Sequence, residues 1–231
     1  MTRTHLRPLI AATVAAGISL SGCSTATGGE PTAPSGASRT TSATSTTTTS
    51  TTTTASAGMI PLTTPAAIFA DVTNYWRTSK SHIDIPAVTL VSDPDAPSCT
   101  DGDYSGATAA MCGNADSGQV VYSGPKVDAL LAQTHGPMAV TIILAHEFGH
   151  AILSYSGAYP DGPGVTRSDV PSAELSADCL AGVYVAGRGY AAADVDAALP
   201  LTALDAHPVR VAAFRAGMSA SAPKQCITNY E

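Results

Sequence analysis

The sequence predicts an α+β fold with many helices and a small sheet of short strands. Four segments of helical length start at or beside a proline, which suits the first turn of a helix: Pro65, Pro137, Pro171 and Pro208. Only two or three short segments show the alternation and the Val-rich composition of strands. We find no internal repeat along the 231 residues, so a single folded domain is expected.

The predicted elements begin near Met59, where the composition changes from Ser and Thr to apolar residues. A helix is predicted over 65–76, with Pro65 at its first helical position. Strands are predicted over 87–91, which alternates and is rich in Val and Leu, and over 119–122. The other predicted elements are a polar loop at 92–107, helices at 127–133 and 137–154, a Gly/Pro loop at 156–170, and helices at 171–185, 191–199 and 208–218.

Residues 1–22 have the features of a secretory signal peptide. Arg3 and Arg7 give a positive start, and 9–20 is an apolar run too short for a spanning helix, which needs about 20 residues. The segment Leu20-Ser21-Gly22-Cys23 resembles the bacterial lipobox, in which cleavage precedes a cysteine that receives lipid. By this resemblance Cys23 anchors the chain to the extracytoplasmic side of a bacterial cell membrane. The alternative is an ordinary signal peptide that is cut elsewhere.

Residues 23–58, which begin with the lipidated cysteine, are predicted to form a disordered linker. They are mostly Ser and Thr and contain almost no apolar side chain larger than alanine. Such a segment cannot bury enough surface to offset the entropy lost on ordering. The linker would therefore hold the domain at 59–231 away from the membrane.

The charge of the chain bears on its partners. It has 11 Lys and Arg against 18 Asp and Glu, a net charge of −7. An acidic chain is poorly suited to neutralise phosphates, so no nucleic-acid partner is expected. Only four of the acids are glutamates, and this scarcity makes each glutamate informative.

The segment His146-Glu147-Phe148-Gly149-His150 matches the pattern H-E-x-x-H. Residues i and i+4 share one helix face, so both imidazoles can reach one Zn²⁺ ion. Glu147 would project beside the metal and serve as general base. The seven residues before His146 carry no charge, so a His-Glu-His cluster here would be costly unless it is satisfied. The pattern therefore predicts a zinc site.

A third ligand is predicted on the next long helix. Glu174 and Asp178 are again four residues apart, so they share a face. Glu174 is the predicted ligand, and Asp178 would accept a hydrogen bond from the far nitrogen of a ligand histidine. Within 59–231 the only glutamates are Glu147, Glu174 and the terminal Glu231, so both internal ones fall at the predicted metal site.

These motifs resemble the bacterial neutral zinc metallopeptidase family, which are zincins of the gluzincin type. The resemblance rests on H-E-F-G-H at 146–150 and on E-L-S-A-D-C-L-A-G-V at 174–183, and it covers most of 66–231. It implies a helix-rich, zincin-like domain with His146, His150 and Glu174 as zinc ligands and Glu147 as general base. Ala151 stands where the family has another histidine, and the segment between His207 and Arg210 is shorter than in the family.

The mechanism that the resemblance implies needs a donor for the oxyanion that develops during peptide hydrolysis. His207, Arg210 and Tyr184 are the candidates, in that order. For His207 the alternative is a histidine that merely precedes Pro208 at a helix start. For Arg210 the alternative is a structural ion-pair partner.

Without Cys23, four cysteines remain in the chain. Outside the cytoplasm an even number favours disulfides, and four cysteines allow three pairings. Of these we favour Cys99–Cys112, which would close the loop between the two strands, and Cys179–Cys226, which would join the Glu174 helix to the C-terminal tail.

The function predicted from the sequence is that of an extracytoplasmic zinc metalloendopeptidase, a hydrolase anchored in the cell envelope as a lipoprotein. Its expected partners are a peptide or protein substrate in the envelope and the membrane itself. The alternative is a non-catalytic envelope lipoprotein that retains zinc and acts as a binding or scaffold module.

Overall fold

The computed structural model describes residues 59–79, 87–100, 102–113, 118–158, 166–167, 169–228 and 230. These residues fall within one compact unit, Thr53–Glu231. The predicted signal peptide 1–22, the lipidated Cys23 and the linker 23–58 lie outside the described residues. So do 159–165, the middle of the loop predicted at 156–170.

The described part of the chain has an α+β fold, as the sequence predicts. Its helices are α1 Pro65–Thr78, α2 Gly124–Leu131, α3 Gly136–Tyr155, α4 Ser172–Gly187, α5 Ala192–Ala198, α6 Pro208–Met218 and α7 Lys224–Thr228, with short 3₁₀ helices η1 Leu199–Leu201 and η2 Ala203–Ala206. Its strands are β1 Thr89–Asp93, β2 Ser98–Cys99, β3 Gly102–Asp103, β4 Ala109–Cys112, β5 Gln119–Ser123, β6 Thr166–Arg167 and β7 Val170–Pro171.

The predicted helices all occur, and α6 has the predicted bounds. The polar loop predicted at 92–107 is wrong in part, because β2 and β3 form a small antiparallel pair within it. Strand β4 was not predicted, since its sequence Ala-Ala-Met-Cys has no β-branched residue and no alternation. The two-residue strands β6 and β7 and the five-residue α7 were also missed, because such short elements carry no period.

The main sheet has the strand order β1-β5-β4. β1 runs parallel to β5, and β4 runs antiparallel to β5 with Met111 opposite Val120. β5 is the middle strand. Its consecutive residues Val120 and Val121 point to opposite faces and are both buried, as in a sheet covered on both faces. β4 is an edge strand of this sheet and packs beside α3.

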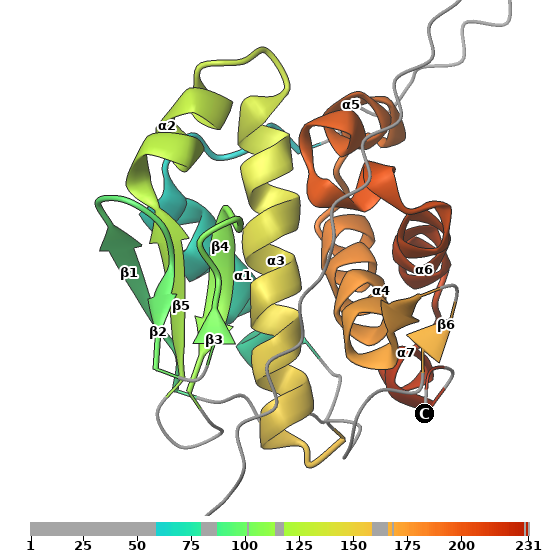
Figure 1. Ribbon diagram of the computed structural model, residues 1–231. Helices are drawn as coiled ribbons and strands as arrows, with labels where there is room; N and C mark the ends of the chain where they lie inside the picture. Colours follow the sequence, from blue (N-terminus) through green and yellow to red (C-terminus); the bar gives the residue numbers. More distant parts are fainter. Residues whose placement is uncertain are drawn as a thin grey trace, which may run out of the picture. The chain divides into compact units, whose positions relative to one another are not determined.

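Helix α3 runs through the middle of the domain, with the sheet on one side and the C-terminal helices α4 to α7 on the other (Figure 1). It is apolar nearly all round, as expected of a helix buried by neighbours on every side. By length and composition α3 is the one helix among the described residues that could cross a membrane, but most of it is buried within the domain.

Helices α4 and α6 pack closely because glycines face each other across their contact. A Cβ atom on Gly182 of α4 would run into the backbone of Phe214 and Met218 on α6. A Cβ atom on Gly217 of α6 would run into the backbone of Cys179 on α4. Neither position therefore accepts a larger residue without moving one helix.

Both predicted disulfides are confirmed. Cys99–Cys112 joins β2 to the end of β4, and Cys179–Cys226 joins α4 to α7. Each bridge lies next to a residue that matters below: Cys112 follows Met111, and Cys179 follows Asp178.

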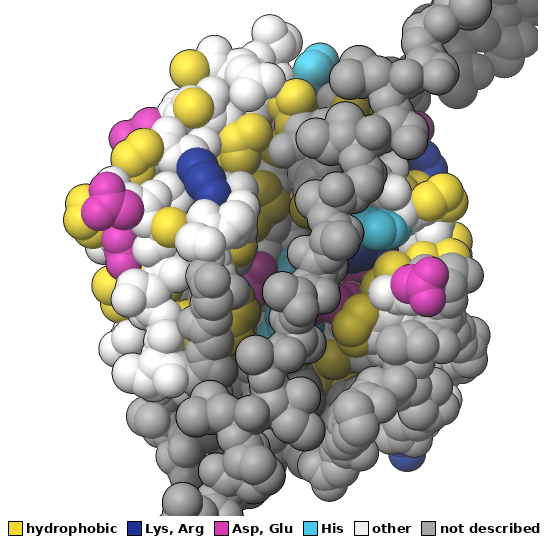
Figure 2. Space-filling view, in the orientation of Figure 1, with side chains coloured by type: hydrophobic (Ala, Val, Ile, Leu, Met, Phe, Trp, Pro, Cys, Tyr) yellow, Lys and Arg dark blue, Asp and Glu magenta, His cyan; other side chains and the backbone are white. Residues whose placement is uncertain are grey.

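A cavity of about 560 Å³ lies between the edge strand β4 and the C-terminal helices, and α3 forms its floor. Acidic and histidine side chains gather in the hollow between these two sides of the domain (Figure 2). The candidate site lies in this cavity.

Candidate metal centre

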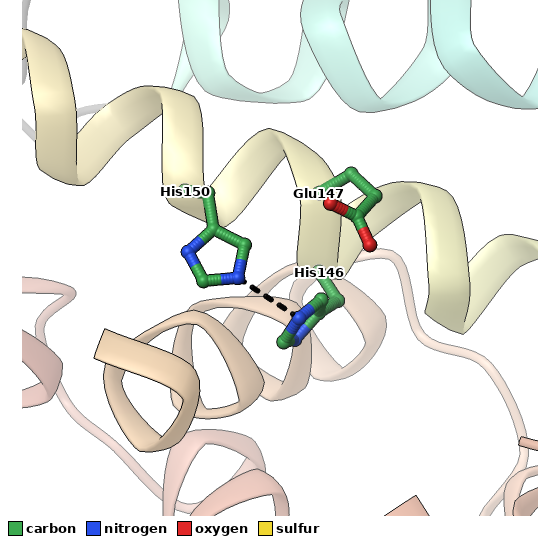
Figure 3. Close-up of side chains that lie close together, drawn as sticks. All are labelled: His146, Glu147 and His150. Carbon is green, nitrogen blue, oxygen red and sulfur yellow. Dashed lines mark hydrogen bonds between the residues drawn. The ribbon is translucent and has the colours of Figure 1, made fainter. Parts of the chain in front are cut away.

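Helix α3 supplies the first three side chains of the site: His146, Glu147 and His150. The two histidines are one turn apart, and their rings turn toward each other with an Nε2–Nε2 distance of 3.1 Å (Figure 3). All three residues are buried, with exposed fractions of 6, 8 and 8%. Their potential ligand atoms lie within 4.8 Å of one another, so this group could bind a metal ion.

Helix α4 brings Glu174 and Asp178 to the same place. Glu174 Oε2 lies 3.4 Å from His146 Nε2, and Glu174 Oε1 lies 3.2 Å from His150 Nε2. Asp178 Oδ1 lies 2.8 Å from His146 Nδ1, the nitrogen on the other side of the ring. This is the common arrangement of a metal-binding histidine, whose second nitrogen is held by a carboxylate.

The two carboxylates of α4 differ in their surroundings. The Asp178 side chain is completely buried, whereas that of Glu174 is 31% exposed. Glu174 lies in the first turn of α4, where the helix dipole favours a negative charge. The more exposed carboxylate is therefore the one that faces the two Nε2 atoms and the cavity.

Arg210 of α6 reaches into the site, where its shortest contacts are to carboxylates. Its Nη2 also lies 3.5 Å from Nδ1 and 3.4 Å from Nε2 of His146. Its Nε donates to Asp178 Oδ2 at 2.8 Å and its Nη2 donates to Asp178 Oδ1 at 2.8 Å. Nη2 also lies 3.0 Å from Glu174 Oε2. These are the contacts of an ion-pair partner, the alternative to oxyanion donor that the sequence left open.

The other two oxyanion candidates do not lie at this centre. Tyr184 is buried, and its hydroxyl donates to Asp71 Oδ2 at 2.8 Å, where Arg188 also binds. His207 is exposed at the start of α6 and is not among the described residues that line the cavity. The role predicted for His207 therefore stays a prediction, and we assign none to Tyr184.

In the metal-free site, the neighbouring groups stabilise the charged forms of His146 and Glu174. Burial lowers the pKa of His146, but the Asp178 and Glu174 carboxylates outweigh burial and raise this pKa to about 10. Burial raises the pKa of Glu174, but hydrogen bonds from His146 and His150 outweigh it and hold this pKa well below its usual range. A metal ion bound at His146 Nε2 would replace the proton there and would supply the positive charge that faces Glu174.

The backbone of β4 holds Glu147 from the other side. The Met111 amide donates to Glu147 Oε2 at 2.8 Å. This amide is free for the contact because β4 is an edge strand and every second N–H of such a strand points away from the sheet. The sequence did not reveal this contact, since a backbone donor leaves no mark in the residue type.

Strand β4 and the segment before it form the opposite wall of the cavity. Small side chains such as Ala109 and Ala110 line it, together with Tyr104. Lys126 holds the segment before β4 in place. Its ammonium lies 3.2, 3.0 and 2.8 Å from the backbone oxygens of Ser105, Gly106 and Ala107.

In comparisons with known proteins, the chain matches no family model, no curated protein and no solved structure. The family resemblance stated from the motifs therefore stays a prediction.

Proposed function

We propose that this protein is a zinc metallopeptidase and belongs to the bacterial neutral zinc metallopeptidase family. One observation carries the proposal: the Nε2 atoms of His146 and His150 and the carboxylate of Glu174 converge within 3.4 Å of one another, beside Glu147 and at an open cavity. Two imidazoles, one carboxylate and an open side are the features of a catalytic zinc site rather than of a closed structural one.

The donor separations support zinc. Ligand atoms about 2.0–2.1 Å from a tetrahedral zinc ion lie about 3.3 Å apart. The measured separations are 3.1 Å between the two Nε2 atoms and 3.2 and 3.4 Å from these to the Glu174 oxygens. The three groups thus need little movement to bind a tetrahedral ion, and a histidine–carboxylate set suits zinc better than magnesium or calcium.

In the proposed hydrolysis, the metal ion, Glu147 and the Met111 amide have separate roles. A bound zinc ion would supply the Lewis acidity that polarises the scissile carbonyl and acidifies water. Glu147 takes a proton from the water that attacks the carbonyl carbon, and it passes this proton to the amide nitrogen as the C–N bond breaks. The Met111 amide fixes one Glu147 oxygen, which leaves the other oxygen for the proton.

The test is the substitution Glu147→Gln, which keeps the size of the side chain and removes its basicity. We expect the variant to bind Zn²⁺ as the wild type does and to lose peptide hydrolysis by a factor of about 10²–10⁴, the usual contribution of a general base. Asp128→Asn is the matched control, because Asp128 is an exposed carboxylate on α2, away from the cavity.

The measurements are metal content and cleavage of a peptide library, with and without chelator. Unchanged turnover by Glu147→Gln would refute the mechanism. Zinc without any cleavage by the wild type would favour the alternative function, a non-catalytic zinc-containing lipoprotein.

We also propose that the protein acts outside the cytoplasm of a bacterium, held to the cell membrane by lipid on Cys23, with a peptide or protein of the envelope as substrate. The lipobox-like segment and the Ser/Thr-rich linker support this proposal. Labelling with palmitate tests it: the wild type should take up label and partition with membranes. A Cys23→Ala variant that still did both would exclude lipidation at this residue.

A further inference from the structure

We propose that Arg210 is a positioning residue of the metal centre, which holds both carboxylates of α4 in the arrangement that binds the ion. This role differs from the oxyanion donor expected from the sequence, which would touch the substrate. The inference rests on metal binding by His146, His150 and Glu174, and not on peptide hydrolysis.

The contacts of Arg210 form a chain that ends at a metal ligand. Two bonds of 2.8 Å from Nε and Nη2 fix the plane of the Asp178 carboxylate. The same Oδ1 atom that accepts from Nη2 lies 2.8 Å from His146 Nδ1. The orientation of the His146 ring is therefore set by Asp178, and that of Asp178 is set by Arg210.

Arg210 also acts on the ligand carboxylate directly. Nη2 lies 3.0 Å from Glu174 Oε2, so a single nitrogen touches both acids of α4. Glu174 is the more exposed of the two and would have more rotamer freedom if nothing held it. The guanidinium thus fixes the two carboxylates relative to each other.

The close packing of α4 and α6 makes this reach possible. Gly182 lies one turn after Asp178 on α4, and Gly217 lies two turns after Arg210 on α6. The backbones meet at these glycines, where a Cβ atom would run into the facing helix. Because the helices are this close, the Arg210 side chain lies against α4 and is only 12% exposed.

Two effects of opposite sign decide what removal of Arg210 does. Its positive charge repels a metal cation, and its Nη2 lies 3.4 Å from the ligand atom His146 Nε2, so removal would raise metal affinity on charge alone. Removal also leaves the fully buried Asp178 without two of its three bonds of 2.8 Å, and a buried carboxylate in that state reorients toward other donors. We expect the second effect to prevail, because Asp178 has no access to water that could replace the guanidinium.

The experiment measures the Zn²⁺ affinity of the full chain by competition with a chelator, in the wild type, Arg210→Met and Arg210→Lys. We expect Arg210→Met to bind Zn²⁺ about 10–100-fold more weakly, the usual effect of losing a partner behind the ligands. Arg210→Lys should fall between the two, since lysine keeps the charge but cannot make the paired bonds.

Arg188→Met is the matched control. Arg188 follows the other end of α4 and makes the same paired bonds to Asp71, at 2.8 and 2.8 Å, away from the metal centre. It should lower thermal stability and leave Zn²⁺ affinity unchanged. The absorption spectrum of bound Co²⁺ should change in Arg210→Met and not in Arg188→Met.

Zn²⁺ binding by Arg210→Met as tight as in the wild type, or tighter, would overturn the proposal; if hydrolysis were then lost, Arg210 would act on the substrate instead. If Arg210→Met does not fold, Gly217→Ala tests the same idea, because it displaces α6 and should weaken Zn²⁺ binding with Arg210 intact. A wild type that binds no Zn²⁺ would overturn this proposal and the proposed function together. A wild type that binds Zn²⁺ without cleaving peptides would overturn only the proposed function.

Discussion

The two walls of the cavity hold their functional groups in different ways. The helical wall, from α3, α4 and α6, contributes every charged side chain among the described residues that line the cavity. These charges are held by one another, as Arg210, Asp178 and His146 illustrate. The strand wall has no charged side chain in the described lining, and it contacts the centre through the Met111 amide. If the proposed function is correct, the helical wall would bind the ion and the strand wall would position the base.

The largest expected effect tests the helical wall as a whole. Removal of metal with a chelator should abolish hydrolysis completely, and added Zn²⁺ should restore it. At free Zn²⁺ about 1,000-fold above its Kd, the bound ion should stabilise the domain by about 4 kcal/mol, measured as a shift in thermal unfolding. A chelated protein that kept both its activity and its Tm would show that no metal acts at this wall.

The second prediction compares the disulfides, one beside each wall. Cys99–Cys112 closes a separation of 13 residues and Cys179–Cys226 one of 47. The chain-entropy model predicts that replacing each pair by serine costs about 3 and about 4 kcal/mol, respectively. Loss of Cys179–Cys226 should also weaken Zn²⁺ binding, because Cys179 adjoins Asp178. Denaturant unfolding and chelator competition measure the two effects; equal Zn²⁺ affinity in both variants would contradict the division between the walls.

The third prediction isolates the strand wall. Met111→Pro removes the amide that bonds to Glu147 but no bond to β5, since this amide points away from the sheet. A hydrogen bond to a charged group contributes about 1.5–3 kcal/mol, so kcat should fall about 10–100-fold. Zn²⁺ affinity should not change. Met111→Leu keeps the amide and serves as control, and a loss of Zn²⁺ in Met111→Pro alone would show that β4 supports the ligands as well.

The prediction with the least bearing on catalysis is a pH dependence of the stability of the metal-free domain. The pKa of His146 is raised from 6.5 to about 10 in the folded state. Its contribution to stability is therefore complete below pH 6.5 and is lost as the pH rises through about 10. Urea unfolding of the chelated protein from pH 6 to 10 measures it; stability that rose over this range would contradict the proposed His146–Asp178 interaction.

Much of the helical wall could be predicted from the sequence. His146 and His150, and likewise Glu174 and Asp178, are four residues apart, and a helix places such residues on one face whatever surrounds it. Glutamate is scarce in the chain, and two of its four glutamates are Glu147 and Glu174. The strand wall was less predictable, because β4 consists of small residues that lack a strand pattern.

The sequence left three cysteine pairings open, but by itself it determined the fold class, the predicted helices and the pairs of polar residues on α3 and α4. These depend on local spacing and composition, which the chain carries without further information. Only the tertiary structure decided that Arg210 binds Asp178, 32 residues away, and that the Met111 amide binds Glu147, 36 residues away. The first depends on how closely two glycines let α4 and α6 approach. The second depends on which strand lies at the sheet edge, and a backbone amide is the same in every residue but proline.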